Sequence, residues 1–387
     1  MPPRRRVVSA LAWGLAIAAL VAPTGASAQA ALTGPANDVT PASASCPPKT
    51  GQVTTFVGVN VSDSAIANGR FRACALNALV KAHVGVIRDP FYWAGIEIAP
   101  GMYSFAQTDT YVADAARHGL QVLPVLMWAP SFRSTAPANP KHGFYPPKNP
   151  ADMGAFAAVL AKRYGPDGDF WAQHPSLPKV PIRDWQVWNE PNLPVYWVTG
   201  PSPSEYTALL KATADGLRSV DPGADVVSAG LPYSRLRGTL SPERFLSGMY
   251  AAGAKGSFNT LAVHPYSDTI SRMVVALKRM RRVLTRGGDS GVPIWVTEVG
   301  WASSGPKSVF TVTAAKQASL IASMVRTLAR DRQSIGMKGV VIHNLRDQRP
   351  GRGDHDYWGF HAGLFDLKGK PKPALAALRR AAAHVRA

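Results

Sequence analysis

Two glutamates, each at the end of an apolar stretch, are the residues of this chain best placed to do chemistry. Glu190 lies in WQVWNEPNLPVYW, where aromatic and β-branched residues give way to an amide, a carboxylate and a proline. Glu298 lies in PIWVTEVGW, which has the same design. Because Pro191 and Pro194 cannot donate to a strand ladder, the first stretch predicts a strand that ends close to Glu190. Two converging carboxylates can serve as a general acid and a nucleophile.

The two carboxylates converge only if their strands are parallel members of one sheet, whose carboxyl ends share an edge. Eight apolar strand candidates alternate with helical stretches, which is the pattern of an α/β protein with a (β/α)8 TIM barrel. The strand candidates are residues 54–60, 84–90, 121–130, 185–190, 225–232, 258–266, 293–298 and 339–345. The proline-rich passage 131–150 is too polar for the core, so we expect it to wall a substrate cleft.

The N-terminal residues indicate export. Arg4, Arg5 and Arg6 precede an apolar run over 7–22, and small residues follow, so residues 1–28 are predicted to be a signal peptide. The alternative is an uncleaved anchor, although the run is shorter than the ~20 residues that a membrane span needs. Residues 29–50 are rich in Ala, Pro, Ser and Thr, which predicts a flexible lead-in. Residues 51–387 would then form one catalytic domain, with no transmembrane segment, outside the cell.

Cys46 and Cys74 are the only cysteines in the chain. In an exported protein, such a pair permits one disulfide that would fasten the lead-in to the first helix. Two unpaired thiols are the alternative, and the spacing does not decide between them.

The chain is strongly basic, with a formal net charge of +19. That balance favours anionic partners such as acidic cell-envelope polymers, or non-specific contact with nucleic acid. The densest cluster belongs to one amphipathic helix and is either a solvated outer face or a docking patch: Lys278, Arg279, Arg281, Arg282 and Arg286. The sequence contains no GxxxxGK[ST], HExxH or paired CxxC motif, so neither a nucleotide, a metal nor a specific nucleic acid is expected.

From Thr54 to the C-terminus the chain resembles the clan A retaining glycoside hydrolases, with families 5 and 39 the nearest. Asn189-Glu190-Pro191 and the TEVGW glutamate, Glu298, carry the resemblance. It implies that Glu190 is the acid/base and Glu298 the nucleophile. Retaining enzymes need these two carboxyl groups about 5 to 5.5 Å apart.

The resemblance also implies roles for neighbouring side chains. Arg88 is similar to the arginine that holds the nucleophile's charge, and Tyr266 to the tyrosine that hydrogen-bonds it. Asn189 resembles the amide that binds the sugar 2-hydroxyl. His264 is expected to contact substrate, or else to order a loop or a carboxylate. Structural alternatives stay open for the others too, as an ion pair for Arg88 and rim packing for Tyr266.

Aromatic residues at the predicted strand ends could stack on pyranose rings or could pack in the core. Trp128 and Trp301 are the candidates for substrate binding. One departure from the family pattern concerns the eighth strand, which ends in His343-Asn344 where many clan members place a tryptophan. Tyr357 or Trp358, in the loop that follows, could supply the missing sugar platform.

The sequence thus predicts a secreted, monomeric glycosidase that hydrolyses O-glycosyl bonds of a β-linked polysaccharide or glycoside by double displacement, without a cofactor. Transglycosylation is one alternative. A catalytically silent barrel that binds an envelope polysaccharide is another, and a nucleic-acid binder is a weaker third.

Overall fold

A computed structural model describes residues 46–61, 69–139, 142–351 and 355–385 of the chain. The predicted signal peptide, residues 1–28, and most of the predicted lead-in lie outside the described residues. None of the helices in the described ranges has the length and apolar character needed to cross a bilayer.

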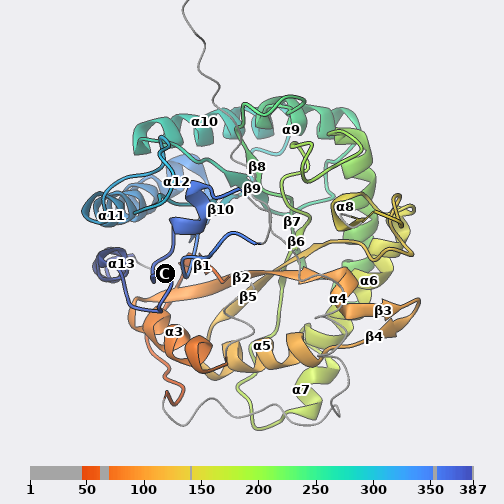
Figure 1. Ribbon diagram of the computed structural model, residues 1–387. Coiled ribbons are helices and arrows are strands. Elements are labelled where there is room, and N and C mark those ends of the chain that lie inside the picture. The colour runs from red at the N-terminus through yellow and green to blue at the C-terminus, as the bar shows by residue number, and fades with distance from the viewer. Residues whose placement is uncertain (1–45, 62–68, 140–141, 352–354, 386–387) are drawn as a thin grey trace, which may run out of the picture.

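One parallel sheet of nine strands curls through the molecule and confirms the expected α/β class (Figure 1). The strand order is β7-β6-β5-β2-β1-β11-β10-β9-β8. The bounds are β1 (Thr54–Asn60), β2 (Val84–Tyr92), β5 (Gln121–Met127), β6 (Asp184–Val187), β7 (Asp225–Val227), β8 (Leu231–Pro232), β9 (Leu261–His264), β10 (Ile294–Val299) and β11 (Met337–Ile342).

The strands are apolar on both faces because both faces are covered. Six side chains from six different strands form a small inner cluster: Val86, Leu123, Val227, Ala262, Trp295 and Val341. Residues of alternate register, such as Ile87 and Val340, belong to the large core between the sheet and the helices. This two-sided burial explains why the strands read as continuous apolar runs in the sequence.

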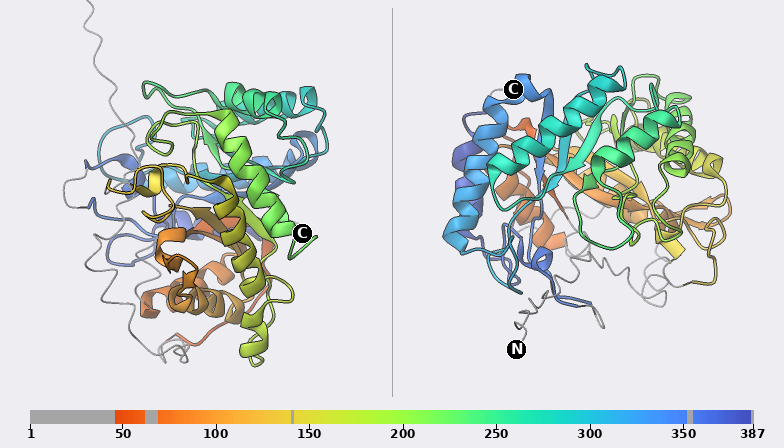
Figure 2. Two further views of the ribbon diagram at one scale, coloured as in Figure 1. Left: turned by 90° about the vertical axis from the view of Figure 1, so that its right-hand side faces the viewer. Right: turned by 90° about the horizontal axis from the view of Figure 1, so that it is seen from above.

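Helices cover the outer face of the sheet in all three views (Figures 1 and 2). The long ones are α3 (Gly69–Lys81), α5 (Ala106–Arg117), α6 (Pro150–Tyr164), α8 (Pro203–Arg218), α9 (Pro242–Ala251), α10 (Ile270–Arg286), α11 (Ala314–Arg330) and α13 (Pro373–Ala382). Ser202 caps α8, since its side chain accepts a hydrogen bond from the Glu205 amide. Short elements that the sequence did not indicate are α4 (Trp93–Ile96), β3 (Glu97–Ala99), β4 (Met102–Tyr103), η1 (His142–Phe144), α7 (Asp169–Gln173), α12 (Arg332–Ile335) and η2 (Trp358–His361).

The predicted fifth strand is divided in two. Residues 228–230 separate β7 from β8, and these two segments end the strand order on opposite sides. Val227 nevertheless forms a parallel bridge with Thr260, just before β9, and the Ser228 amide donates to the Thr260 carbonyl at 2.9 Å. The two ends of the sheet are therefore consecutive segments of the chain.

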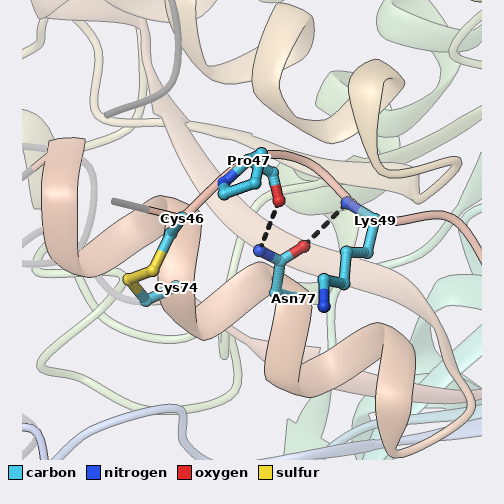
Figure 3. The surroundings of a disulfide bond; sticks show 5 residues. All are labelled: Cys46, Pro47, Lys49, Cys74 and Asn77. Carbon is cyan, nitrogen blue, oxygen red and sulfur yellow. Dashed lines mark hydrogen bonds between the residues drawn. A yellow bond between two sulfur atoms is a disulfide. The ribbon is translucent and has the colours of Figure 1, made fainter. Parts of the chain in front are cut away.

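A disulfide joins Cys46 to Cys74 in α3 (Figure 3). Beside it, Asn77 Nδ2 donates to the Pro47 carbonyl and the Lys49 amide donates to Asn77 Oδ1, both at 2.8 Å. These three links hold the segment before β1 against the first long helix.

Candidate active site

The parallel sheet brings the candidate residues to one edge. Asn60 ends β1 and His264 ends β9, while Arg88 lies within β2 and Glu298 within β10. Glu190 follows the last residue of β6 by three positions. Since all these strands run in the same direction, their carboxyl ends and the side chains there converge.

The two glutamates meet across a short gap. A carboxylate oxygen of Glu190, one of Glu298 and a ring nitrogen of His264 all lie within 4.8 Å of one another. Carboxyl groups this close suit retaining glycosidases, which place them about 5 to 5.5 Å apart, and not inverting ones, which separate them by about 6.5 to 9.5 Å. Both glutamates are largely buried, with 6% of Glu190 exposed and 14% of the Glu298 side chain.

Glu190 is held by an unusual backbone conformation. Trp188 and Glu190 have φ angles of 68° and 48°, in the left-handed region that non-glycine residues seldom adopt. Hydrogen bonds fix the turn, because the Trp188 amide donates to the Leu126 carbonyl at 2.9 Å and the Glu190 amide to the Gly230 carbonyl at 3.2 Å. Such conformations persist where the surroundings over-determine them, and they cluster at functional sites.

Arg88 bonds both to Glu298 and to Asn189, the residue next to Glu190. Its Nη1 donates to Glu298 Oε1 at 2.7 Å, and its Nη2 donates to Asn189 Oδ1 at 2.9 Å. The same guanidinium reaches Asn60 Oδ1 at 2.9 Å and Gln186 Oε1 at 2.6 Å. Arg88 is 3% exposed and each of its three guanidinium nitrogens donates a hydrogen bond, so its orientation is fixed.

These bonds orient the Asn189 carboxamide. Because its oxygen accepts from Arg88, its amide nitrogen is the group left to donate, and within the described part of the chain that nitrogen makes no hydrogen bond. A donor at this position is what recognition of a sugar hydroxyl requires.

The electrostatics of Glu298 favour its ionised form. Burial opposes ionisation, but the charges of His264, Arg88 and His343 and the hydrogen bond from Tyr266 outweigh it and hold the pKa of Glu298 far below its usual range. The Tyr266 hydroxyl donates to Glu298 Oε2 at 2.9 Å. A carboxylate bonded in this way is negative at neutral pH, as a nucleophile must be.

Glu190 has the opposite electrostatic environment. Burial raises the pKa of Glu190, and the negative charge of Glu298 adds to that shift, while the hydrogen bond from His264 reduces it without reversing it. Arg88 donates to Glu298, not to Glu190. Two neighbouring carboxylates whose pKa values are pushed apart indicate an acid and a nucleophile.

Two residues predicted to bind substrate are buried, and for His264 the structure favours the stated alternative, the ordering of a carboxylate. His264 is completely buried, with Nδ1 at 2.7 Å from Glu190 Oε1 and Nε2 at 3.0 Å from Thr297 Oγ1, so it positions the acid instead of touching a sugar. Trp301 is also completely buried, and its indole nitrogen donates to the Ser267 carbonyl at 2.8 Å. A fully covered ring cannot stack on a ligand.

Aromatic side chains nevertheless lie at the carboxyl edge of the sheet, where Trp128 directly follows β5. Trp128 keeps 7% of its surface exposed and packs against Phe144, with ring centroids 4.5 Å apart. In the loop after β11, the ring of Trp358 packs edge-on against Tyr266, with ring centroids 5.1 Å apart. His343 Nδ1, at the end of the eighth strand, lies 3.9 Å from Glu298 Oε2. An imidazole and a loop tryptophan thus surround the tyrosine where a strand-end tryptophan was missing from the sequence.

The sequence did not indicate the partners of Arg88. Asn60 and Gln186 lie in predicted strands, and each is a polar residue in an otherwise apolar run. Gln186 is completely buried, and its Nε2 donates to the Ser228 carbonyl at 3.2 Å. A polar residue inside a buried strand was the signal that could have identified both.

Glu190, His264 and Glu298 are close enough to hold a metal ion. Arg88 already places a fixed positive charge on Glu298, and His264 lies at hydrogen-bond distance from Glu190. The donor set therefore suits proton transfer better than a cation.

No protein family model and no curated protein sequence matches the chain. Solved structures do match. A family 39 glycoside hydrolase from Bacteroides cellulosilyticus is 19% identical, with a TM-score of 0.63 over 86% of this chain. The chain spans 64% of the length of that enzyme. This chain has the fold of a glycoside hydrolase.

Two further structures agree. A monomeric β-xylosidase from Caulobacter crescentus is 17% identical, with a TM-score of 0.64, and the match covers 85% of this chain and 68% of that one. An intracellular xylanase from Thermoanaerobacterium saccharolyticum is 15% identical, with a TM-score of 0.54, and the match covers 85% and 98% of the two chains. In fold alone, these neighbours agree with the resemblance drawn from the motifs.

Proposed function

We propose that this chain is a retaining glycoside hydrolase that cleaves a β-linked glycoside or polysaccharide by double displacement. The observation that carries the proposal is the pair of buried glutamates, close together and with pKa values shifted in opposite directions. Fold similarity to xylosidases and a xylanase supports the same reaction class. Because one fold hosts many functions, the geometry of the two glutamates is the main support for this reaction.

In the first step, Glu190 donates its proton to the glycosidic oxygen while Glu298 attacks the anomeric carbon. The carbon–oxygen bond to the leaving group breaks as the ester bond to Glu298 forms, and the leaving group departs as an alcohol. Arg88 and Tyr266, both bonded to Glu298, orient the attacking carboxylate. Because those donors also stabilise the departing carboxylate, they assist the second step as well.

In the second step, Glu190, now ionised, removes a proton from a water molecule that attacks the same carbon. The bond to Glu298 breaks, and the sugar leaves with its original anomeric configuration. His264, bonded to Glu190, holds this carboxyl group in place for both steps. The Asn189 amide is placed to donate to the sugar 2-hydroxyl, an interaction that strengthens in the transition state.

We also propose that the curled sheet is a closed (β/α)8 barrel in which β7 and β8 are two halves of the fifth strand. Two contacts support closure on both sides of residues 228–230, which separate β7 from β8. Val227 bridges to Thr260, and β8 pairs with β9. Secretion remains part of the proposal and is supported by the Cys46–Cys74 disulfide, since such bonds persist in oxidising compartments.

Hydrolysis of a panel of p-nitrophenyl β-glycosides (xyloside, glucoside, mannoside and galactoside) tests the proposal. We expect turnover of at least one of them, with the β-anomer of the sugar released first in an NMR time course. The Glu298→Ala variant should be inactive on the same substrate. Release of the α-anomer, or no turnover of any member by the wild type, would contradict the proposed reaction, and the latter result would favour a binding protein.

A further inference from the structure

The basic helix α10 presents its positive charges in two different ways. Arg281 turns toward the protein and donates to four backbone carbonyls, those of residues 290, 292, 335 and 336, at 2.7 to 3.1 Å. Its role is to fasten α10 to neighbouring loops. Arg279, Arg282 and Arg286 are exposed and recur at the spacing of one helical face. The cluster is therefore partly structural and partly available to a partner.

These three arginines face a hollow between α9 and α10, which lie side by side in the outer layer (Figures 1 and 2). The hollow has a volume of about 610 Å³. Arg244 of α9 adds a fourth guanidinium, and the rest of the lining is Glu243, Ser247 and Val283. The hollow shares no residue with the candidate active site.

The four guanidinium groups are poorly neutralised. None of them forms an ion pair with a carboxylate in the part of the chain that the structure describes. Glu243, the one acidic residue of the lining, accepts a hydrogen bond from the Tyr233 hydroxyl at 2.7 Å, and Arg279 contacts the same hydroxyl. A concave surface with a surplus of unpaired arginines concentrates positive potential and attracts anions.

We propose that this hollow binds a single strand of an acidic polysaccharide, whose carboxylate, sulfate or phosphate groups pair with the arginines. Guanidinium groups bind such oxyanions bidentately. Glu243 and Ser247 add acceptors for sugar hydroxyl groups, which an anionic glycan carries between its charges. The inference does not depend on the proposed function, since it concerns a separate surface.

Other polyanions fit the lining less well. None of the described residues that line the hollow is aromatic, so the lining offers no platform on which the bases of a nucleic acid could stack. Val283, the one apolar residue among those described there, is 6% exposed and offers nothing to insert into a lipid surface.

The test measures binding of polygalacturonate by isothermal titration calorimetry at low and at physiological salt. The variant carries Arg279→Gln, Arg282→Gln and Arg286→Gln together. The matched control removes the same charge from exposed sites on α11 and α13, through Lys316→Gln, Arg379→Gln and Arg380→Gln. We expect the first variant to bind at least about tenfold more weakly and the control to stay within about twofold of the wild type. Uncharged dextran should bind to none of the three.

A second variant, Arg244→Gln, tests the opposite wall and should weaken binding by about threefold. Thermal unfolding checks that each variant is folded. The proposal is overturned if polygalacturonate does not bind, if the two triple variants lose affinity equally, or if dextran binds as well. It is also overturned if duplex DNA or phosphatidylglycerol vesicles bind more tightly than polygalacturonate through the same arginines.

Discussion

At each edge of the sheet, one cationic side chain lies beside two carboxylates, and the two edges differ in how the bonds are shared. At the amino edge, Lys338 near the start of β11 donates to Asp184 of β6 and to Asp225 of β7, the latter at 2.6 Å. Its ammonium group also lies 4.7 Å from the ring centroid of Trp295. Both carboxylates therefore share one cation.

At the carboxyl edge, Arg88 bonds Glu298 and leaves Glu190 to His264. The pKa of Glu298 is held far below its usual range, whereas the pKa of Glu190 is raised. Burial raises the pKa of Asp184 at the amino edge as well, so a raised pKa does not by itself mark a catalytic acid. The asymmetric sharing of the cation, next to aromatic residues at the edge where barrel enzymes place their chemistry, is what distinguishes the site.

Removing one carboxylate from each edge should have very different effects on activity. We expect Glu298→Gln to lower kcat/KM on an aryl β-glycoside by at least about 10⁴-fold, because the nucleophile is lost. Asp184→Asn removes a carboxylate at the amino edge and should keep kcat/KM within about threefold. Steady-state kinetics measure kcat/KM for the two variants. A similar loss of kcat/KM in both would contradict the claim that catalysis takes place at the carboxyl edge alone.

Replacing the proposed acid should make activity depend on the leaving group. In Glu190→Gln, kcat/KM for an alkyl β-glycoside should fall by about 10³-fold, because its oxygen needs a proton. For a dinitrophenyl glycoside, whose leaving group departs without one, kcat/KM should stay within about tenfold of the wild type. Equal losses on both substrates would remove Glu190 from the role of acid.

Removing the shared cation at the amino edge should lower the stability of the fold and leave catalysis unchanged. Lys338→Met leaves two neighbouring carboxylates without their shared cation, so we expect the free energy of unfolding to fall by about 2 kcal/mol, reduced from a fully buried case by partial exposure. Urea denaturation measures this, and kcat/KM should not change. Arg330→Met, which breaks the exposed pair with Asp331, is the control and should leave stability unaltered.

The smallest predicted effect is a pH dependence of stability. Because the folded protein raises the pKa of Glu190, it keeps a proton that the unfolded chain has lost, and the free energy of unfolding falls as pH rises from the ordinary glutamate pKa to the raised one. Glu190→Gln should remove this decline and be about 1 kcal/mol more stable than the wild type at pH 7. Urea titrations from pH 4 to 8 would contradict this if the two proteins kept a constant difference.

Much of the carboxyl edge was predictable because local patterns determine it. Apolar runs that end at Glu190 and Glu298 predicted two strands, and a third run placed Arg88 near the end of another strand. The role of Arg88 was predicted from the family resemblance alone. The split of the fifth strand was not predictable, since residues 225–232 read as one run and the break depends on how β7 and β8 pair with different neighbours.

The two substrate contacts that the structure does not support, those of Trp301 and His264, share a physical cause. A tryptophan near a strand end faces either the ligand or the core, and a shift of one residue in register exchanges the two faces. Trp301 faces the core, and its partner Ser267 belongs to a different loop that the sequence does not place beside it. His264 contacts Glu190, which is 74 positions away in the chain, and nothing local specifies that contact.

Trapping the reaction intermediate tests the central claim most directly. A 2-deoxy-2-fluoro derivative of the glycoside that the protein hydrolyses should form a stable sugar ester, which peptide mass spectrometry can locate. We predict one adduct, on Glu298, and faster trapping in the wild type than in Glu190→Gln when the leaving group needs a proton. An adduct on another residue, or turnover without any adduct and with inverted product, would contradict the account.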